Sequence, residues 1–357
     1  MAISARNLVR RWGWRAVGLT VTGIGLYVVA PSLLTMFGSW PRLAEVRLYW
    51  FAELAVLETL SLAALWWLAK ISLAPHPDEQ DDPAGAPPRL GWGTTAAAQL
   101  AGNAASKVVP GGAATGGVIQ AKILIDAGQR PAAVASGLTA ANLLGTAVLL
   151  LLPVLTLPAL FIGPPPAEQL QLGLVVSVVM AAVIVAIGVT ALTWPRVVGA
   201  AGRAIGTVIH LVRPRTTGES VATALLAQRA RIAAAFRGHW WRAVFAAAAN
   251  RMFDYAALVA ALAAFGAHVR PAEVLVAYVV AQAFAIIPIT PGGVGFVDAG
   301  LTSLLVVAGV PADTALIGTL LYRLFSFWLP IPVGALAWAG WRIGSRPGSS
   351  PGPVSPG

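Results

Sequence analysis

The residues best suited to bind a ligand lie in one apolar stretch near the C-terminal end of the chain, residues 286–328. An acid, Asp298, and an arginine, Arg323, stand inside hydrophobic sequence there. The turn that breaks the apolar run before them consists of Pro291, Gly292, Gly293 and Gly295. Irregular backbone and charged groups are tolerated at membrane depth only where protein or water satisfies them. The stretch therefore predicts a polar site inside a membrane protein.

A second Pro-Gly-Gly turn, at Pro110, Gly111 and Gly112, stands 181 residues before the one just described. A helix that begins after such a turn directs its unpaired N–H groups and the positive end of its dipole at the break. We expect two half-helices, starting near Thr115 and Val294, to point from opposite membrane faces at one central region. That arrangement suits an anion such as a lipid phosphate.

A second arginine, Arg251, is expected at about the same depth as Arg323. Helical rise from the nearest interfacial residues places both about 13–15 Å into a hydrocarbon core about 30 Å thick. A charge at that depth costs about 2.5–3.5 kcal/mol on insertion scales, so each arginine needs a partner. Asp254 lies one helical turn from Arg251, and Asp298 can pair with either arginine. Ion pairs that only lock helices together, without touching substrate, stay an alternative.

Weaker polar candidates surround the first break. Asn103 and Lys107 precede it, and Asn142 falls on Arg323 when the two Pro-Gly-Gly turns are aligned. Lys107 can contact a lipid headgroup or extend to the inner surface. A proton-coupling role is open to Glu53 and Glu58, although a water-facing or paired glutamate is the favoured reading. The sequence contains no cysteine, and no motif in it predicts a metal, a cofactor or a catalytic residue.

Composition places these residues in a polytopic membrane protein. Hydrophobic residues make up 57% and charged residues 11% of the chain, with a mean hydropathy of +0.76, whereas soluble domains carry about 25% charged residues. The net charge of +10 does not indicate nucleic acid, because the basic residues gather at the ends of apolar runs. That placement follows the positive-inside rule and predicts that both termini are cytoplasmic.

The predicted fold is all-α, with six full transmembrane helices and two re-entrant broken helix pairs in an inverted repeat. One membrane domain covers residues 1–345, with halves at 15–160 and 170–342, and a disordered tail follows at 346–357. The six spans are expected at residues 19–37, 48–68, 132–160, 170–192, 243–265 and 314–338. The broken pairs are expected at 94–127 and 272–308. Two cytoplasmic interfacial helices are expected within 196–237, at 197–212 and 221–236, with a solvated inner loop as the alternative.

Residues 286–300 (IIPITPGGVGFVDAG) and 320–337 (LLYRLFSFWLPIPVGALA) resemble the membrane region of the lysylphosphatidylglycerol synthase/flippase family. Residues 103–117 (NAASKVVPGGAATGG) are similar to that family's first Asn…Pro-Gly-Gly element. The resemblance implies a flippase-type domain that moves a polar lipid between leaflets. Asp298 stands where the family more often has Glu, and the first break lacks the usual Arg and Glu. Only a tail follows residue 345, so aminoacyl transfer is not expected.

These features predict a transporter rather than an enzyme, located in the bacterial inner membrane. Its substrate is expected to be an anionic or phosphate-bearing lipid, of phospholipid or polyprenyl-phosphate type, held in a central polar cavity. Membrane lipids are the expected partners, nucleic acid is not, and homo-oligomer formation is left open. Two alternatives remain: a secondary transporter of a small soluble ion or metabolite, and a membrane-embedded glycosyl- or acyl-transferase.

Overall fold

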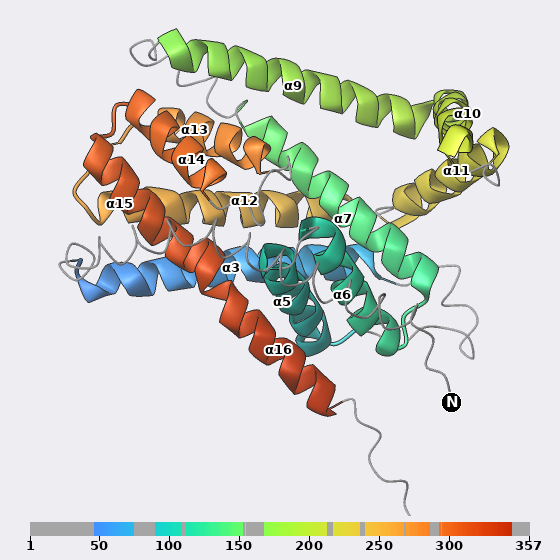
Figure 1. Ribbon diagram of the computed structural model, residues 1–357, viewed down its shortest axis with the longest axis horizontal. Coiled ribbons are helices and arrows are strands. Elements are labelled where there is room, and N and C mark those ends of the chain that lie inside the picture. Colours follow the sequence, from blue (N-terminus) through green and yellow to red (C-terminus); the bar gives the residue numbers. More distant parts are fainter. Residues whose placement is uncertain are drawn as a thin grey trace, which may run out of the picture.

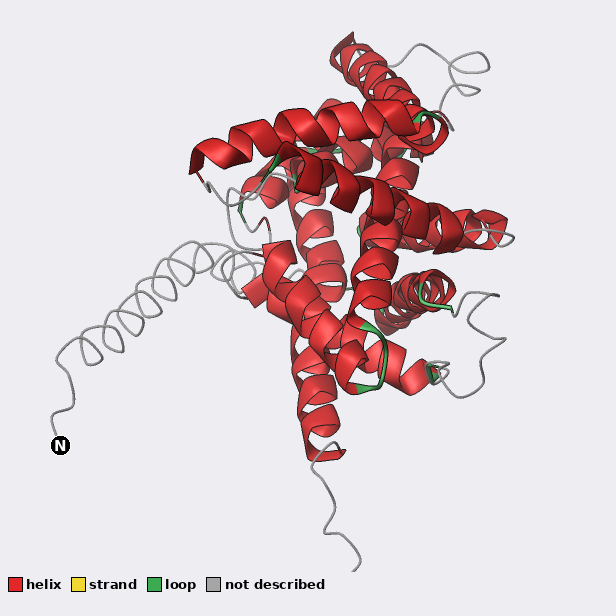
Figure 2. Cartoon of the chain, turned by 90° about the vertical axis from the view of Figure 1, so that its right-hand side faces the viewer, coloured by secondary structure: helices red, strands yellow, loops and turns green. Residues whose placement is uncertain are grey.

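The computed structural model describes residues 46–74, 90–108, 112–152, 154, 168–212, 217–235, 240–267, 269–285, 293 and 295–344. Within these ranges regular structure is helical throughout, and no strand is formed (Figure 2). Among the described residues, three helices are long and apolar enough to cross a membrane: α3 (Leu48–Ser72), α7 (Pro131–Leu151) and the continuous helix Ala312–Ile343. A fourth candidate is bent by 99° between Val185–Ala191 and Pro195–Val208. The chain is therefore a multi-pass helical membrane protein.

The count of six spans stays a prediction. Residues 19–37 lie outside the described residues, as does the tail at 346–357. Residues 170–192 and 243–265 do form long helices, α9 (Glu168–Thr193) and α12 (Trp240–Ala263). Helix α12 does not pass as a span on apolarity by itself, and the C-terminal part of α9 belongs to the bent candidate.

Both broken pairs consist of two short helices, as the sequence predicts. The first pair is α5 (Trp92–Val108) and α6 (Gly112–Asp126), and the second is α13 (Pro271–Phe284) and α14 (Phe296–Val307). Each helix is shorter than the roughly 20 residues that cross a bilayer. The starts differ from the prediction: α6 begins three residues before Thr115, and α14 begins two residues after Val294. The reason is backbone conformation, because Gly112 (φ 45°) and Gly295 (φ 80°) take the positive φ at the turn into each helix.

Helices α3 and α12 lie side by side in the centre and run in opposite directions (Figure 1). Ser61 Oγ donates to the Asn250 carbonyl (3.1 Å), and Asn250 Nδ2 donates to the Ser61 carbonyl (3.0 Å). Farther along the pair, the rings of Trp67 and Phe245 meet edge to face at 6.1 Å. These contacts fix the register of the two helices.

A single long helix passes this central pair and descends diagonally in Figure 1. It is built from α15 (Ala312–Arg323), a π-helical turn η3 (Leu324–Trp328) and α16 (Pro330–Gly344). The π-turn is closed by the Leu329 N–H, which donates to the Leu324 carbonyl at 2.8 Å. Pro330 has no N–H to donate to the Ser326 carbonyl four residues earlier, so that carbonyl is free for another partner.

Helix α9 lies along the top of the molecule in Figure 1 and leads into α10 (Pro195–Val212) and α11 (Gly218–Ala235) at its far end. The two helices expected within 196–237 are therefore confirmed as helices. They pack closely because small residues face each other, Gly202 against Ala222 and Gly206 against Gly218. Their position at the membrane surface stays a prediction.

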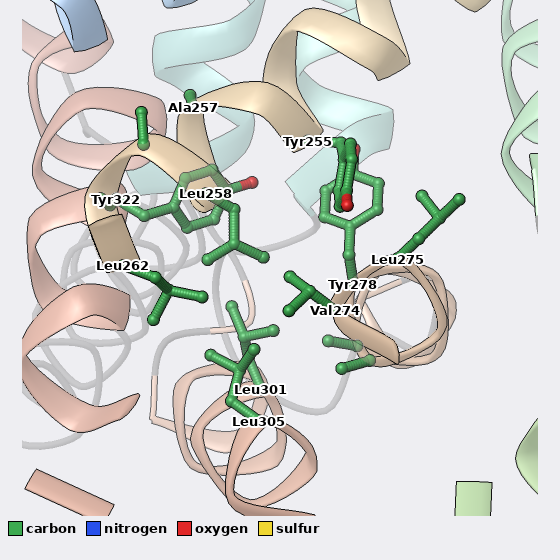
Figure 3. Packing of buried hydrophobic residues seen from close by; sticks show 14 of the residues in the cluster. Tyr255, Ala257, Leu258, Leu262, Val274, Leu275, Tyr278, Leu301, Leu305 and Tyr322 are labelled. Carbon is green, nitrogen blue, oxygen red and sulfur yellow. The ribbon is translucent and has the colours of Figure 1, made fainter. Parts of the chain in front are cut away.

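The largest hydrophobic cluster joins α12, α13, α14 and α15 (Figure 3). Leu258 from α12, Tyr278 from α13, Leu305 from α14 and Leu321 from α15 are all at most 1% exposed. The second broken pair is thus held in a continuous apolar core. This core positions the polar groups described below.

Helix α16 approaches α5 most closely at Gly334. A Cβ atom at this position would lie 2.2 Å from the Leu100 carbonyl oxygen and 2.6 Å from the Ala104 Cβ. Gly340, on the same helix, has nothing within 4 Å of the equivalent position. The first broken pair therefore packs against the C-terminal helix through a backbone contact that only glycine permits.

Gly334→Ala should destabilise the protein, because the added methyl group would push α16 away from α5. Overpacking of this kind costs about 1–3 kcal/mol. In a detergent-solubilised thermal melt, the variant should unfold several degrees below the wild type. Gly340→Ala is the matched control and should be neutral or slightly stabilising, because alanine is the better helix former by about 1 kcal/mol. Equal melting temperatures for the two variants would contradict the packing described.

Candidate functional site

The Asp254 carboxylate on α12 is the centre of the polar site. Its Oδ2 accepts hydrogen bonds from the Tyr278 hydroxyl (2.6 Å) and Gln282 Nε2 (3.0 Å), and its Oδ1 accepts one from the Tyr322 hydroxyl (2.9 Å). Tyr278 and Gln282 are four residues apart, so they share one face of α13. The network joins α12, α13 and α15, and both carboxylate oxygens are satisfied by neutral donors.

An ion pair between Arg323 and Asp298 lies at the start of α14. Arg323 Nε is 2.5 Å from Asp298 Oδ1, and the two side chains are 14% and 20% exposed. Asp298 Oδ2 accepts a hydrogen bond from the Gly295 N–H at 3.0 Å and so caps the helix. The N-terminus that the sequence predicts to face an anion is thus partly occupied by a carboxylate of the chain itself.

Arg323 nevertheless keeps unused donors. Its Nε and Nη2 are buried without a hydrogen-bond partner in the described part of the chain, and so is the Nε of Arg251. Arg323 Nε and Asp298 Oδ1 are close, but the contact does not have hydrogen-bond geometry. A buried donor without an acceptor costs about 1–3 kcal/mol, and more when it is charged. An anion that brings its own acceptor oxygens would satisfy these groups.

Lys107 connects the first broken pair to the long C-terminal helix. Its Nζ donates to the carbonyls of Ser326 (2.7 Å) and Phe327 (3.3 Å) in the π-turn. It also lies 5.1 Å from the centre of the Phe327 ring, and the Arg323 guanidinium lies 5.5 Å from the same ring. The carbonyl freed by Pro330 therefore accepts a lysine from the other half of the chain.

Glu58 on α3 also belongs to the site. Its side chain is 7% exposed, and it interacts electrostatically with Asp254 and with Lys107. Its Oε1 is buried without a hydrogen-bond partner in the described ranges. Glu53, one of the two glutamates singled out in this span, is exposed.

The structure brings five of the predicted site residues together. They lie around the central helices and are Arg251, Asp254, Asp298, Arg323 and Lys107. Asn103 is half-buried on α5, and its Oδ1 has no hydrogen-bond partner among the described residues, whereas Asn142 is exposed on α7. Gly293 and Gly295 precede α14 with positive φ angles of 73° and 80°. Four predicted residues lie outside the described residues, Pro110, Gly111, Pro291 and Gly292.

Two of the alternatives weighed from sequence can now be compared with the geometry. Asp254 accepts from tyrosine and glutamine, and among the described residues it forms no ion pair with Arg251. Asp298 pairs with Arg323 and not with Arg251. Sequence reasoning missed Tyr278, Gln282, Tyr322 and the burial of Glu58. Polar side chains four residues apart in the apolar helix α13 were the available signal.

The described residues contain no group of three or more histidine, cysteine or acidic side chains placed to hold a metal ion. The site instead combines three acidic side chains, Glu58, Asp254 and Asp298, with three basic ones, Lys107, Arg251 and Arg323. Acidic and basic groups that lie close together can stabilise one another at membrane depth. It can also exchange internal partners for those of a charged ligand.

Comparisons with known proteins agree with this chemistry. Residues 7–334 match the family described as the lysylphosphatidylglycerol synthase TM region. A search of curated proteins and a search of solved structures each find no match. The matched range covers nearly all of the chain and every helix of the site, and it indicates a lipid-related function in the membrane. The chain belongs to the lysylphosphatidylglycerol synthase transmembrane-region family.

Proposed function

We propose that the protein is a flippase that moves an anionic, phosphate-bearing lipid across the bacterial inner membrane. The observation that carries the proposal is the Arg323 guanidinium, which is mostly buried and, among the described residues, has one carboxylate partner and donors without a hydrogen bond. A lipid phosphate offers the acceptor oxygens that these donors lack, and arginine binds phosphate through two parallel hydrogen bonds. The family supports a lipid as the substrate.

The proposed transport step depends on competition between the lipid phosphate and the Asp298 carboxylate for the Arg323 guanidinium. A phosphate that reaches the site can displace the Asp298 carboxylate from the guanidinium, while Asp298 keeps its bond to the Gly295 N–H. When the phosphate leaves, Asp298 closes the ion pair again. The acid therefore prevents the arginine from becoming a permanent phosphate trap, and no chemical step on the lipid is involved.

An inverted repeat would allow the site to open first to one side of the membrane and then to the other. Two pairs of glycines with positive φ angles support it, because the members of each pair are 181 residues apart: Gly112 (45°) with Gly293 (73°), and Gly128 (90°) with Gly309 (87°). After Gly128 and after Gly309, the N–H of the next residue donates a hydrogen bond back to the helix that ends there.

We place both termini in the cytoplasm, following the positive-inside rule.

Replacing Arg323 tests the proposal directly. Purified protein is reconstituted with a fluorescent phosphatidylglycerol, and a membrane-impermeant reductant measures how fast label moves between leaflets. Loss of a charge-assisted hydrogen bond costs about 1.5–3 kcal/mol, so Arg323→Ala should move lipid about 10- to 100-fold more slowly than the wild type. Arg323→Lys should retain part of the rate.

Arg342→Ala is the control, since Arg342 lies on the same long helix, is exposed and contacts only the Trp338 ring among the described residues. An unchanged rate in Arg323→Ala would remove the assigned role. Uptake of inorganic phosphate without lipid movement would favour the soluble-ion transporter instead. A covalently altered lipid recovered from the vesicles would favour the transferase.

Asp298→Asn tests the competition between the carboxylate and the phosphate. Asparagine can still accept the Gly295 N–H, but it no longer neutralises Arg323. The variant should retain more phosphatidylglycerol through purification, measured by native mass spectrometry, and should release it more slowly. Asp126→Asn is the control, because Asp126 pairs with Lys122 on the surface. Equal lipid retention in Asp298→Asn and the wild type would argue against the competition.

A further inference from the structure

Glu58 takes no part in the Arg323 ion pair, and its burial needs a separate explanation. It lies on the interior stripe of α3, between Leu54 and Ser61, which packs against α12. Its side chain is 7% exposed, and its Oε1 makes no hydrogen bond within the described ranges. Buried polar atoms in folded proteins nearly always have partners, so an isolated carboxyl oxygen in this position points to a function.

The packing of α3 on α12 places Glu58 beside Asp254. The Ser61–Asn250 hydrogen bonds set the antiparallel register. One turn farther on each helix, the Glu58 and Asp254 side chains interact electrostatically. Two ionised carboxylates that interact in an apolar interior repel each other strongly, so we expect the pair to hold one proton.

The hydrogen bonds decide which carboxyl group carries the proton. Asp254 already accepts from Tyr278, Gln282 and Tyr322, and these donors stabilise its negative charge. Within the described ranges, Glu58 Oε1 has no comparable donor. The proton therefore belongs on Glu58.

Among the described residues, the groups besides Asp254 that interact electrostatically with Glu58 come from α5 and α15. From α5, Lys107 interacts with Glu58, but its ammonium group donates to the Ser326 and Phe327 carbonyls. From α15, the Tyr322 hydroxyl interacts with Glu58 and with Arg323. Helix α7 also packs against α3, and it has no ionisable side chain.

We infer that Glu58 is a proton-carrying site that couples lipid movement to the proton gradient, with Lys107 as the group that displaces the proton. This rests on the proposed function. When α16 moves relative to α5, Lys107 leaves the π-turn carbonyls and turns to Glu58. The Glu58 carboxylic acid then gives its proton to water and remains as a carboxylate paired with the Lys107 ammonium. The reverse movement returns Lys107 to the π-turn and lets Glu58 take a proton from the other side.

Infrared spectroscopy of the full-length purified protein tests the proton site without any transport assay. At neutral pH, wild type should show the C=O stretch of a protonated carboxylic acid, shifted in deuterium oxide. The band should disappear in Glu58→Gln and persist in Glu53→Gln, whose side chain is on the same helix but exposed. A wild type without the band, or a Glu58→Gln variant that retains it, would overturn the inference.

Proteoliposomes containing fluorescent phosphatidylglycerol test the coupling. One pH unit across the membrane should shift the steady-state distribution of label between leaflets, by up to about tenfold for one proton per lipid, and in opposite directions for the two gradients. Glu58→Gln should lose this response and Glu53→Gln should keep it. Lys107→Gln should also lose the response to the pH gradient while retaining the infrared band. This variant tests the coupling if Glu58→Gln does not fold.

Failure of proton coupling can be distinguished from failure of the proposed lipid transport. If wild type moves lipid but the gradient changes nothing, proton coupling is wrong and the proposed lipid transport stands. If wild type moves no anionic lipid, the proposed function fails, and the infrared band alone decides whether Glu58 carries a proton.

Discussion

The whole arrangement depends on keeping one negative charge, that of Asp254, inside an apolar bundle. A carboxylate in this environment is stable only if donors reach both of its oxygens, and here they come from Tyr278 and Gln282 on α13 and Tyr322 on α15. The donors bind the second broken pair and the long C-terminal helix to α12. Because α12 packs against α3, Glu58 lies within the electrostatic reach of this charge.

Much of the fold could be predicted from the sequence, because breaks in apolar runs are local signals. Both broken pairs and the helices at 197–212 and 221–236 appear as expected, with starts displaced by two or three residues where a glycine takes a positive φ. Residue type and spacing also predicted that Asp298 can pair with either Arg251 or Arg323, and the structure shows the pair with Arg323. The contact of Lys107 with Ser326 could not, because it joins residues 219 positions apart and requires a π-turn that spacing does not reveal.

Charge is distributed unequally between positions that are 181 residues apart. Asn142 and Gly117 occupy the places that correspond to Arg323 and Asp298, and Asn142 is exposed rather than directed at the site. The first half contributes Lys107 and Glu58 instead, from helices that precede its break. The proposed phosphate-binding and proton-carrying groups therefore come from different halves of the chain, which meet at the π-turn.

The π-turn also sets the orientation of everything after it. A π-turn contains one residue more than an α-turn, and one residue corresponds to about 100° of rotation around a helix. The segment Leu324–Trp328 therefore acts as an angular spacer between Arg323, which faces the interior, and Gly334, which touches the Leu100 carbonyl. If the turn relaxed to α-helical geometry, α16 would have to rotate as a unit and its glycine would lose contact with α5. The π-turn thus sets the rotational position of α16 against α5, and the hydrogen bonds from Lys107 to the Ser326 and Phe327 carbonyls tie the turn to α5.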